Sequence, residues 1–206
     1  MNMWLNMKKS NFDPIKFFSL AGTLKKIPRT GWLTHGLINV ESIAEHSYRV
    51  GIMGLILSEE MGCDSSKMIK MALIHDIAEI LTGDIVWEHG FLTDFLLKKT
   101  KSERERLAII SLSSLVKSGN ELKLLWEEYE SQKSKEAKLL KQIDKLEMVI
   151  QALEYENPRN PNHLKEFWEN AKKHITEPIL LNIFKELCKR RTPPYNDYDL
   201  IEKNVL

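Results

Sequence analysis

Four residues of types that bind metal ions stand far apart in this chain: His46, His75, Asp76 and Asp144. The adjacent pair lies in the mostly apolar stretch 72–84, which also carries Glu79 and Asp84. Burying ionisable groups among isoleucine, leucine and alanine is costly unless the groups pair with one another or bind a metal. The stretch therefore predicts a cation site, with further ligands supplied by other parts of the chain.

The chemistry of these ligands narrows the choice of metal. Two imidazoles and two carboxylates suit Mn, Fe, Co, Ni or Zn better than Ca²⁺ or an ion that prefers thiolates. On an octahedral ion, four protein ligands leave positions open for water and a substrate oxygen, as hydrolytic sites require. Taken singly, a histidine on an apolar helix is more often a core residue than a ligand. The spacing of all four residues predicts one divalent transition metal per site, of open identity.

The elements that must position these residues are helices. Asp13, Ser42 and Asp64 are suited to capping helix N-termini, Ser42 with Glu45 forms a capping box, and Ser134 starts the long helix. The apolar periodicity and the breakers predict helices over 14–27, 42–62, 64–82, 102–117, 121–130, 134–156, 163–175 and 177–189, with a shorter one ending at residue 99. No alternating strand pattern is visible, so the predicted fold class is all-α.

The predicted helix over 64–82 has a direct consequence for chemistry. His75 and Glu79 would share one face of it, since they are four residues apart. Gly83 would end the helix and leave Asp84 on a loop that can turn back over the metal. Glu79 could alternatively be a plain ion-pair partner of Arg49 or a lysine, and Asp84 a loop residue without chemistry.

The sequence predicts connecting segments at 29–40, 85–90 and 157–162. We expect the tail, 193–206, to be extended or loosely packed. Arg29 and Trp32 open the first connecting segment. Loops that display an arginine beside a tryptophan often face a ligand. The same residues would equally suit a surface ion pair and a core tryptophan, and the sequence leaves both readings open.

Composition limits the class of protein. At 206 residues, with 43% hydrophobic and 29% charged residues, the chain is long enough for one well-buried domain. A net charge of +1 gives no reason to expect nucleic-acid binding, and the longest apolar run, 50–57, is too short to span a membrane. No signal peptide is visible, and Cys63 and Cys188 form no disulfide framework. We therefore expect a cytoplasmic protein.

These motifs carry a resemblance to a known family. The order of His46, His75, Asp76 and Asp144 is similar to that of the HD-domain superfamily of metal-dependent phosphohydrolases, and most similar to its 5′-deoxynucleotidase branch with the HD domain-containing protein 2 relatives. The matching segments are 29–32, 41–49, 75–79, 82–84, 126–132, 136–138 and 144–148. The resemblance implies a single HD domain over 1–206, a bundle of about eight helices with core motifs in 15–160. Residues 161–206, a helical extension and tail, carry no motif.

The resemblance also implies an activity: hydrolysis of 2′-deoxyribonucleoside 5′-monophosphates to deoxynucleoside and phosphate. The implied metal ligands are His46, His75, Asp76 and Asp144. Glu79 and Asp84 would be the catalytic carboxylates, with the acid and base roles unassigned. The implied substrate-binding residues are Arg29, Trp32, Tyr129, Glu130, Ser131 and Gln132. The last four would otherwise be the end of a surface helix.

Partners follow from the same resemblance. The expected partner is a small-molecule nucleoside monophosphate, without nucleic acid or membrane, and the expected assembly is a homodimer. Two other functions stay open: an HD phosphohydrolase acting on another nucleotide or a sugar phosphate, and a non-catalytic module that binds a metal or nucleotide for regulation. An intact set of ligands and carboxylates argues against the second.

Overall fold

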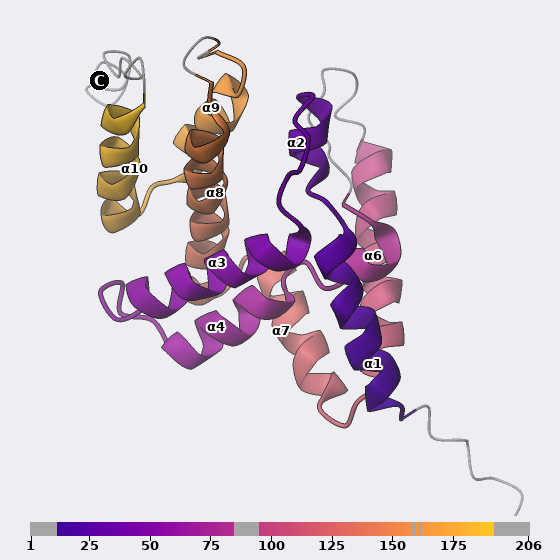
Figure 1. The fold of residues 1–206 in the computed structure, drawn as a ribbon. Helices are drawn as coiled ribbons and strands as arrows, with labels where there is room; N and C mark the ends of the chain where they lie inside the picture. Colours follow the sequence, from indigo (N-terminus) through magenta and orange to yellow (C-terminus); the bar gives the residue numbers. More distant parts are fainter. Residues whose placement is uncertain (1–11, 85–94, 158–159, 161, 192–206) are drawn as a thin grey trace, which may run out of the picture. The chain divides into compact units, whose positions relative to one another are not determined.

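The computed structural model describes residues 12–84, 95–157, 160 and 162–191, and Figure 1 shows that their regular structure is helical. Within those ranges there is no strand, and the isolated antiparallel bridge joins Pro28 to Ser42. The all-α prediction is confirmed. None of the helices in this part of the chain has the length and apolarity needed to cross a bilayer. The chain divides into a first unit, Met1–Ser47 with Leu73–Ser131, and a second unit, Tyr48–Ala72 with Gln132–Leu206.

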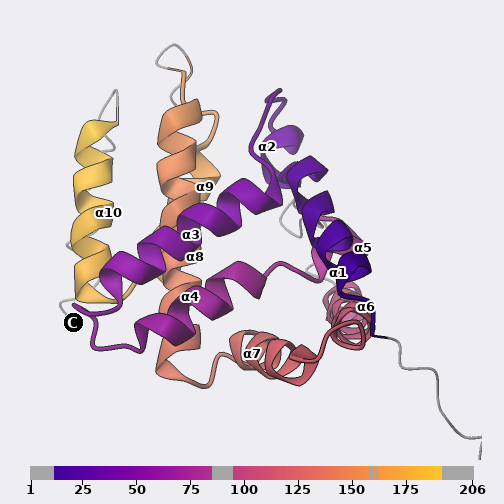
Figure 2. The ribbon, with the colours of Figure 1, turned by 60° about the horizontal axis from the view of Figure 1, so that its bottom comes forward.

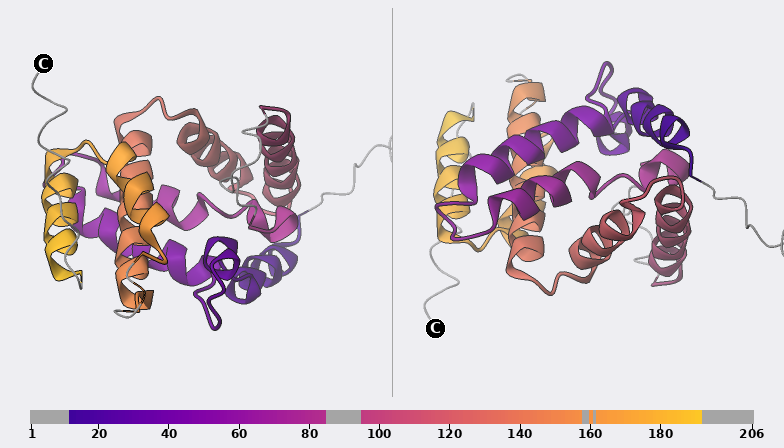
Figure 3. Two further views of the ribbon diagram at one scale, coloured as in Figure 1. Left: turned by 90° about the horizontal axis from the view of Figure 1, so that it is seen from above. Right: turned by 90° about the horizontal axis from the view of Figure 1, so that it is seen from below.

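The first unit contains most of the elements that carry the predicted site. They are α1 (Pro14–Ala21), the 3₁₀ helix η1 (Gly22–Lys26), α2 (Thr30–Thr34), α5 (Glu79–Thr82), α6 (Phe95–Ser113) and α7 (Gly119–Ser131). Helix α6 packs against both α5 and α7, as Figure 3 also shows. The turn between α6 and α7 requires glycine, because a Cβ on Gly119 would lie 1.8 Å from the main-chain oxygen of Ser113.

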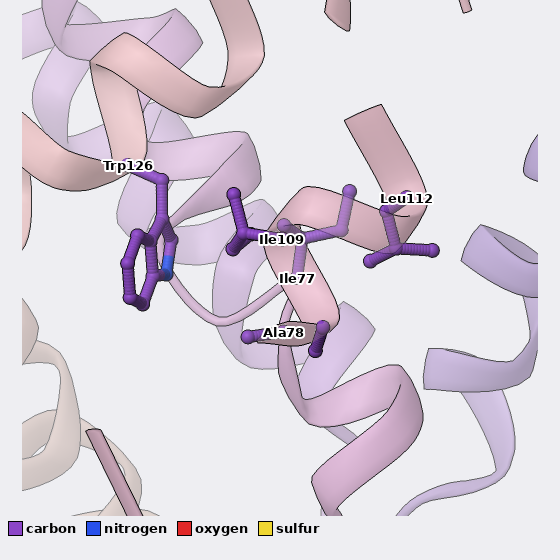
Figure 4. Close-up of a cluster of buried hydrophobic side chains, with 6 residues drawn as sticks. Ile77, Ala78, Ile109, Leu112 and Trp126 are labelled. Carbon is purple, nitrogen blue, oxygen red and sulfur yellow. The ribbon is translucent and has the colours of Figure 1, made fainter. Parts of the chain in front are cut away.

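The core of the first unit includes residues of the turn that precedes α5. Its buried side chains come from that turn, α6 and α7, and are Ile77, Ala78, Ala108, Ile109, Leu112 and Trp126, most of which Figure 4 labels. Phe17 and Leu20 of α1 pack against this cluster. Because Ile77 and Ala78 lie directly between Asp76 and Glu79, this packing holds in place the segment that carries the predicted chemistry.

The second unit is built from α8 (Lys135–Tyr155), α9 (Lys165–His174), α10 (Pro178–Arg190), most of α3 (Ile43–Leu57) and most of α4 (Ser65–Ile74). Helices α3 and α4 form an antiparallel pair in Figure 2, and a Cβ on Gly54 would lie 3.7 Å from Met68 Cβ. Helix α8 packs against α9 and α10. Leu140, Ile143 and Leu146 of α8 are fully buried.

The predicted caps, and Ser134 as the start of a helix, are confirmed. Asp13, Asp64 and Ser134 each accept a hydrogen bond, of 2.9, 3.1 and 3.2 Å, from the main-chain amide three residues later. Ser42 and Glu45 form the reciprocal capping box, with Ser42 N donating to Glu45 Oε2 over 2.6 Å and Glu45 N donating to Ser42 Oγ over 3.3 Å. The hydrogen bond from the Ser42 main chain, with a second from its hydroxyl, lowers the pKa of Glu45.

Three predicted boundaries were wrong. The loop predicted over 29–40 contains helix α2, because Trp32 is buried and its Nε1 donates a 2.9 Å hydrogen bond to Glu41 Oε1. The break predicted between residues 99 and 102 does not occur within α6, where Lys101 pairs with Glu105 one turn later at 3.3 Å. Helix α3 ends at Leu57 rather than near Gly62, whose positive φ of 63° lies in the turn that follows.

Some predictions lie outside the residues that the structure describes: the irregular connection at 85–90 and the tail at 193–206. The loop at 157–162 is described only in part. Of the predicted extension over 161–206, α9 and α10 are present. The assignment of 1–206 to a single HD domain stays a prediction.

Candidate metal centre

His46, His75 and Asp76 come together in the first unit. Helix α3 supplies His46, and the other two follow the end of α4. Each offers one ligand atom, and these atoms all lie within 4.8 Å of one another. Asp76 Oδ2 is 3.2 Å from His75 Nε2 and 3.8 Å from His46 Nε2, and both imidazoles are buried. The predicted convergence of these three residues is thus present in the geometry.

The helix predicted over 64–82 is interrupted at this point, which corrects the expected placement of His75 and Glu79 on one continuous helix. Helix α4 ends at Ile74, a turn covers 75–78, and α5 begins at Glu79. The amides of Ile77 and Glu79 bond to carbonyls three residues back rather than four, at 3.0 Å each. This tighter winding turns His75 and Asp76 together toward His46. Segments of this kind inside helices often mark functional sites.

Arg29 lies beside two of the predicted site carboxylates. Its Nη1 donates a 3.1 Å hydrogen bond to Asp76 Oδ2 and is 3.8 Å from Asp84 Oδ1. Burial raises the pKa of Asp76, but the stronger combined effect of His75, Arg29 and His46 holds it below its ordinary value. Asp76 is therefore a carboxylate, the form that a metal ligand requires.

Glu79 has the opposite electrostatic environment. Burial raises its pKa to about 9, with Asp76 and Asp84 adding to the effect, while Arg29 and Lys101 oppose it. Glu79 Oε2 is buried and accepts no hydrogen bond from the residues of the described ranges. Lys101 Nζ of α6 lies 3.8 Å from Glu79 Oε1. The lysine alternative for the partner of Glu79 is thus the one present, since Arg49 pairs with Glu147 and Glu154.

The predicted substrate-binding residues divide into groups. Arg29 lies at the site, and the ring of Tyr129, itself buried, packs edge-on against the His75 ring at 5.3 Å. Trp32 is only 2% exposed and bonds to Glu41, which matches the alternative of a core tryptophan. Three others stay predictions: Glu130 and Ser131, which are exposed at the end of α7, and Gln132, which belongs to the second unit.

Asp144, the predicted fourth ligand, lies on α8 in the second unit. Its carboxylate is 94% buried, and Oδ2 is 3.2 Å from Lys141 Nζ. Its part in binding the metal stays a prediction.

The residues present fit a divalent transition metal. Two buried imidazole nitrogens and a deprotonated carboxylate oxygen converge on one small region, and such donors suit ions from Mn to Zn. The buried Glu79 Oε2 adds an acceptor close to that region that no described donor satisfies. The donor set therefore supports the predicted cation site but does not choose among these metals.

Sequence reasoning did not single out Thr30 or Lys101. Thr30 donates two hydrogen bonds to Asp84, and Lys101 lies between Glu79 and Glu105. The only signal for Thr30 was its place beside Arg29 in the segment 29–32. Lys101 was one of several lysines near a predicted helix end, so nothing in the sequence separated it from a solvated charge.

Comparison with known proteins places the chain in a family. The HD-domain family model matches residues 21–186. A 5′-deoxynucleotidase HDDC2 of Danio rerio is 38% identical over 180 residues, which cover 86% of this chain and 87% of the relative. The chain belongs to the 5′-deoxynucleotidase HDDC2 family of HD-domain proteins. The resemblance drawn from the sequence, and with it the enzyme class, is confirmed at the level of family.

Other members of the HDDC2 family and a solved structure agree with this placement. The 5′-deoxynucleotidase HDDC2 of Homo sapiens is 34% identical over 181 residues, which cover 86% of each chain. A solved structure of a conserved hypothetical protein from Pyrococcus furiosus is 37% identical, covers 85% of this chain and 99% of its own, and superposes with a TM-score of 0.68. The segments 29–32, 75–79 and 82–84 therefore lie in a fold shared with proteins of this family.

Proposed function

We propose that this chain is a metal-dependent 5′-deoxynucleotidase that converts 2′-deoxyribonucleoside 5′-monophosphates to deoxynucleoside and phosphate. The observation that carries the proposal is the buried group of His46, His75 and Asp76, with Arg29 bonded to Asp76, in a member of the HDDC2 family. Asp144 is proposed as the fourth ligand. The cofactor is one divalent ion of the Mn, Fe, Co, Ni or Zn class.

In this proposal the cation and Arg29 both bind the phosphate of the substrate. A divalent ion bound there would supply Lewis-acid polarisation of a phosphoryl oxygen and would lower the pKa of water. The planar guanidinium of Arg29 has hydrogen-bond donors that match the oxygens of a phosphate. Its contacts with Asp76 and Asp84 hold it beside the predicted metal ligands. It would stabilise the charge that spreads over the phosphoryl oxygens during transfer.

Glu79 and Asp84 are the two carboxyl groups proposed for proton transfer. Phosphomonoester hydrolysis needs a proton removed from the attacking water and a proton delivered to the leaving 5′-oxygen. The raised pKa of Glu79 favours its protonated form in the metal-free protein, whereas Asp84 accepts a hydrogen bond from Thr30 N and faces Arg29. Two carboxyls in such different environments suit opposite roles in one reaction.

The remaining predicted residues complete the substrate pocket in this proposal. Tyr129 packs on His75 and so fixes the orientation of that imidazole. Trp32, whose Nε1 donates a hydrogen bond to Glu41, would support α2 beside Arg29 and back the sugar side of the pocket from the core. Glu130, Ser131 and Gln132 would line the base side. We also propose a homodimer, which light scattering would test.

The deciding experiment measures phosphate release from a panel of deoxyribo- and ribonucleoside monophosphates and a sugar phosphate, with Mn²⁺, Co²⁺, Ni²⁺ or Zn²⁺. The wild-type chain should prefer the deoxyribonucleotides and lose activity in EDTA. His75→Ala should lose both bound metal, measured by elemental analysis, and activity. His174→Ala, at an exposed histidine of α9, is the matched control and should retain both.

Other outcomes would contradict the proposal in distinguishable ways. Activity that survives removal of the metal would rule out the mechanism. A preference for the sugar phosphate would keep the metal centre but change the substrate. Metal binding without hydrolysis of any compound would favour the regulatory binding module.

A further inference from the structure

Thr30 contacts Asp84 with both its main chain and its side chain. The Thr30 amide donates a 2.7 Å hydrogen bond to Asp84 Oδ2, and Thr30 Oγ1 donates a second, also of 2.7 Å, to the main-chain oxygen of Asp84. The two residues are 54 positions apart in the chain. One residue therefore fixes both the backbone and the carboxylate of the other, and both hydrogen bonds are short.

The position of Asp84 in the chain explains why it needs hydrogen bonds from another element. Asp84 follows Gly83, whose φ of 73° ends α5, and α5 itself is only four residues long. A helix of one turn gains little stability from its own hydrogen bonds. The position of a carboxylate just beyond its end therefore depends on contacts with other elements, and the hydrogen bonds from Thr30 are contacts of this kind.

The hydrogen bond from the Thr30 amide also distinguishes the two oxygens of the Asp84 carboxylate. Oδ2 accepts from the Thr30 amide, whereas Oδ1 lies 3.8 Å from Arg29 Nη1. Arg29 also donates a hydrogen bond to Asp76, so Oδ1 of Asp84 is the oxygen turned toward the predicted metal ligands. A change of the Asp84 side chain to another χ1 rotamer would replace that arrangement.

We propose that Thr30 is a positioning residue of the reaction: its hydroxyl and amide together hold Asp84 with Oδ1 directed to the substrate beside Arg29. This inference rests on the proposed nucleotidase function. Thr30 itself acts through Asp84 and has no contact with the reacting atoms. Its effect is expected in kcat, because a misplaced carboxylate weakens proton transfer more than it weakens binding of the substrate.

The test compares Thr30→Val, Thr30→Ser and Thr34→Val by steady-state kinetics on a deoxyribonucleoside monophosphate. Valine keeps the branched shape and the amide of Thr30 but removes the hydroxyl, and loss of one such hydrogen bond should lower kcat by about tenfold with KM changed by less than about twofold. Serine keeps the hydroxyl and should restore kcat. Thr34 lies on the same helix and bonds to Gly31 O, so Thr34→Val should act like the wild type.

A double-mutant cycle with Asp84→Ala tests whether Thr30 changes kcat through Asp84. If Thr30 acts through Asp84, Thr30→Val should lower kcat no further in the Asp84→Ala background. An equal fall in both backgrounds, or a Thr30→Val enzyme indistinguishable from Thr34→Val, would overturn the proposal. Circular dichroism and bound metal monitor folding, and Thr30→Ala replaces the valine variant if that variant does not fold.

The outcome for the wild type separates this inference from the function on which it rests. A wild-type chain without activity on any monophosphate contradicts the nucleotidase function, and the role of Thr30 fails with it. A wild-type chain that is active while Thr30→Val keeps full kcat contradicts the role of Thr30 alone.

Discussion

Arg191 in the second unit and Arg29 in the first unit both meet buried carboxylates, and their surroundings differ. Arg191 Nε lies 2.7 and 2.8 Å from the two oxygens of Glu156, and Arg191 Nη2 lies 2.7 Å from Oε1. Trp168 Nε1 donates a further 2.8 Å hydrogen bond to Glu156, and the guanidinium lies 5.1 Å from the centre of the Trp168 ring. Here one positive charge and one negative charge are matched with several short hydrogen bonds.

Around Arg29 one guanidinium is shared by two carboxylates. Asp76 and Asp84 both lie within 4.0 Å of its guanidinium, and the nearby Glu79 has its pKa raised to about 9 by burial and by these two aspartates. The buried imidazoles of His46 and His75 add further electron-pair donors. These donors could share an additional cation, whereas Glu156 already has a guanidinium of its own.

The difference between Arg191 and Arg29 shows how a structural ion pair can be distinguished from a functional site when both are made of buried charged groups. A buried pair with matched charge and complete hydrogen bonding maintains the fold. A buried group in which two carboxylates share one guanidinium, and in which pKa values are driven apart, is a candidate for function. Three sets of substitutions test this distinction.

The largest effect is expected at Glu79. Glu79→Gln keeps the shape of the side chain but removes the titrating group, so kcat should fall by about a hundredfold or more while the metal content stays unchanged. Kinetics with elemental analysis would check both. The matched control is Glu103→Gln, at an exposed position of α6. A parallel loss of metal would instead make Glu79 a ligand.

The same variant gives a pH-dependent readout in the EDTA-treated protein. The pKa of Glu79 is raised from 4.5 to about 9, so between these values the folded state keeps a proton that the unfolded state has lost. The free energy of unfolding should therefore fall as the pH rises through this window. Glu79→Gln should show a flatter dependence than the wild type in urea unfolding at pH 5 to 8. An identical slope in both proteins would contradict the raised pKa.

A smaller effect on activity is expected at Arg29. Arg29→Lys keeps the charge but loses the planar pair of donors, so kcat/KM should fall by about tenfold for a phosphomonoester. Arg104→Lys, at an exposed position of α6, is the control and should leave kcat/KM unchanged. If Arg29→Lys behaves like this control, Arg29 is a structural partner of Asp76 and the contrast with Arg191 disappears.

At Arg191 the expected effect on catalysis is the smallest, and the change appears in stability. Arg191→Met leaves the buried Glu156 without its guanidinium, which should lower the free energy of unfolding by about 3–5 kcal/mol. The kcat of the folded protein should stay within about twofold of the wild type. Arg190→Met, at the exposed neighbouring residue, is the control for chemical denaturation. A loss of kcat in Arg191→Met without a change in stability would contradict the structural role.

The chain's local signals predicted most of its elements. Asp13, Ser42 and Asp64 were predicted as caps and Ser134 as the start of a helix, and each accepts a hydrogen bond from an amide three residues later. Such contacts depend only on residue type and short spacing, so they can be read without knowing the fold. The family motif likewise named His46, His75 and Asp76 as one group.

Tertiary structure alone decided how those residues are held. The turn at 75–78 interrupts a helix that periodicity made continuous, because Ile77 and Ala78 pack into the core of the first unit. The hydrogen bonds from Thr30 to Asp84 span 54 positions, and no local pattern reports a partner so distant in sequence. The residue types determined that a cation could bind. Packing, which depends on the whole folded chain, determined which carboxylate faces Arg29 and which faces Lys101.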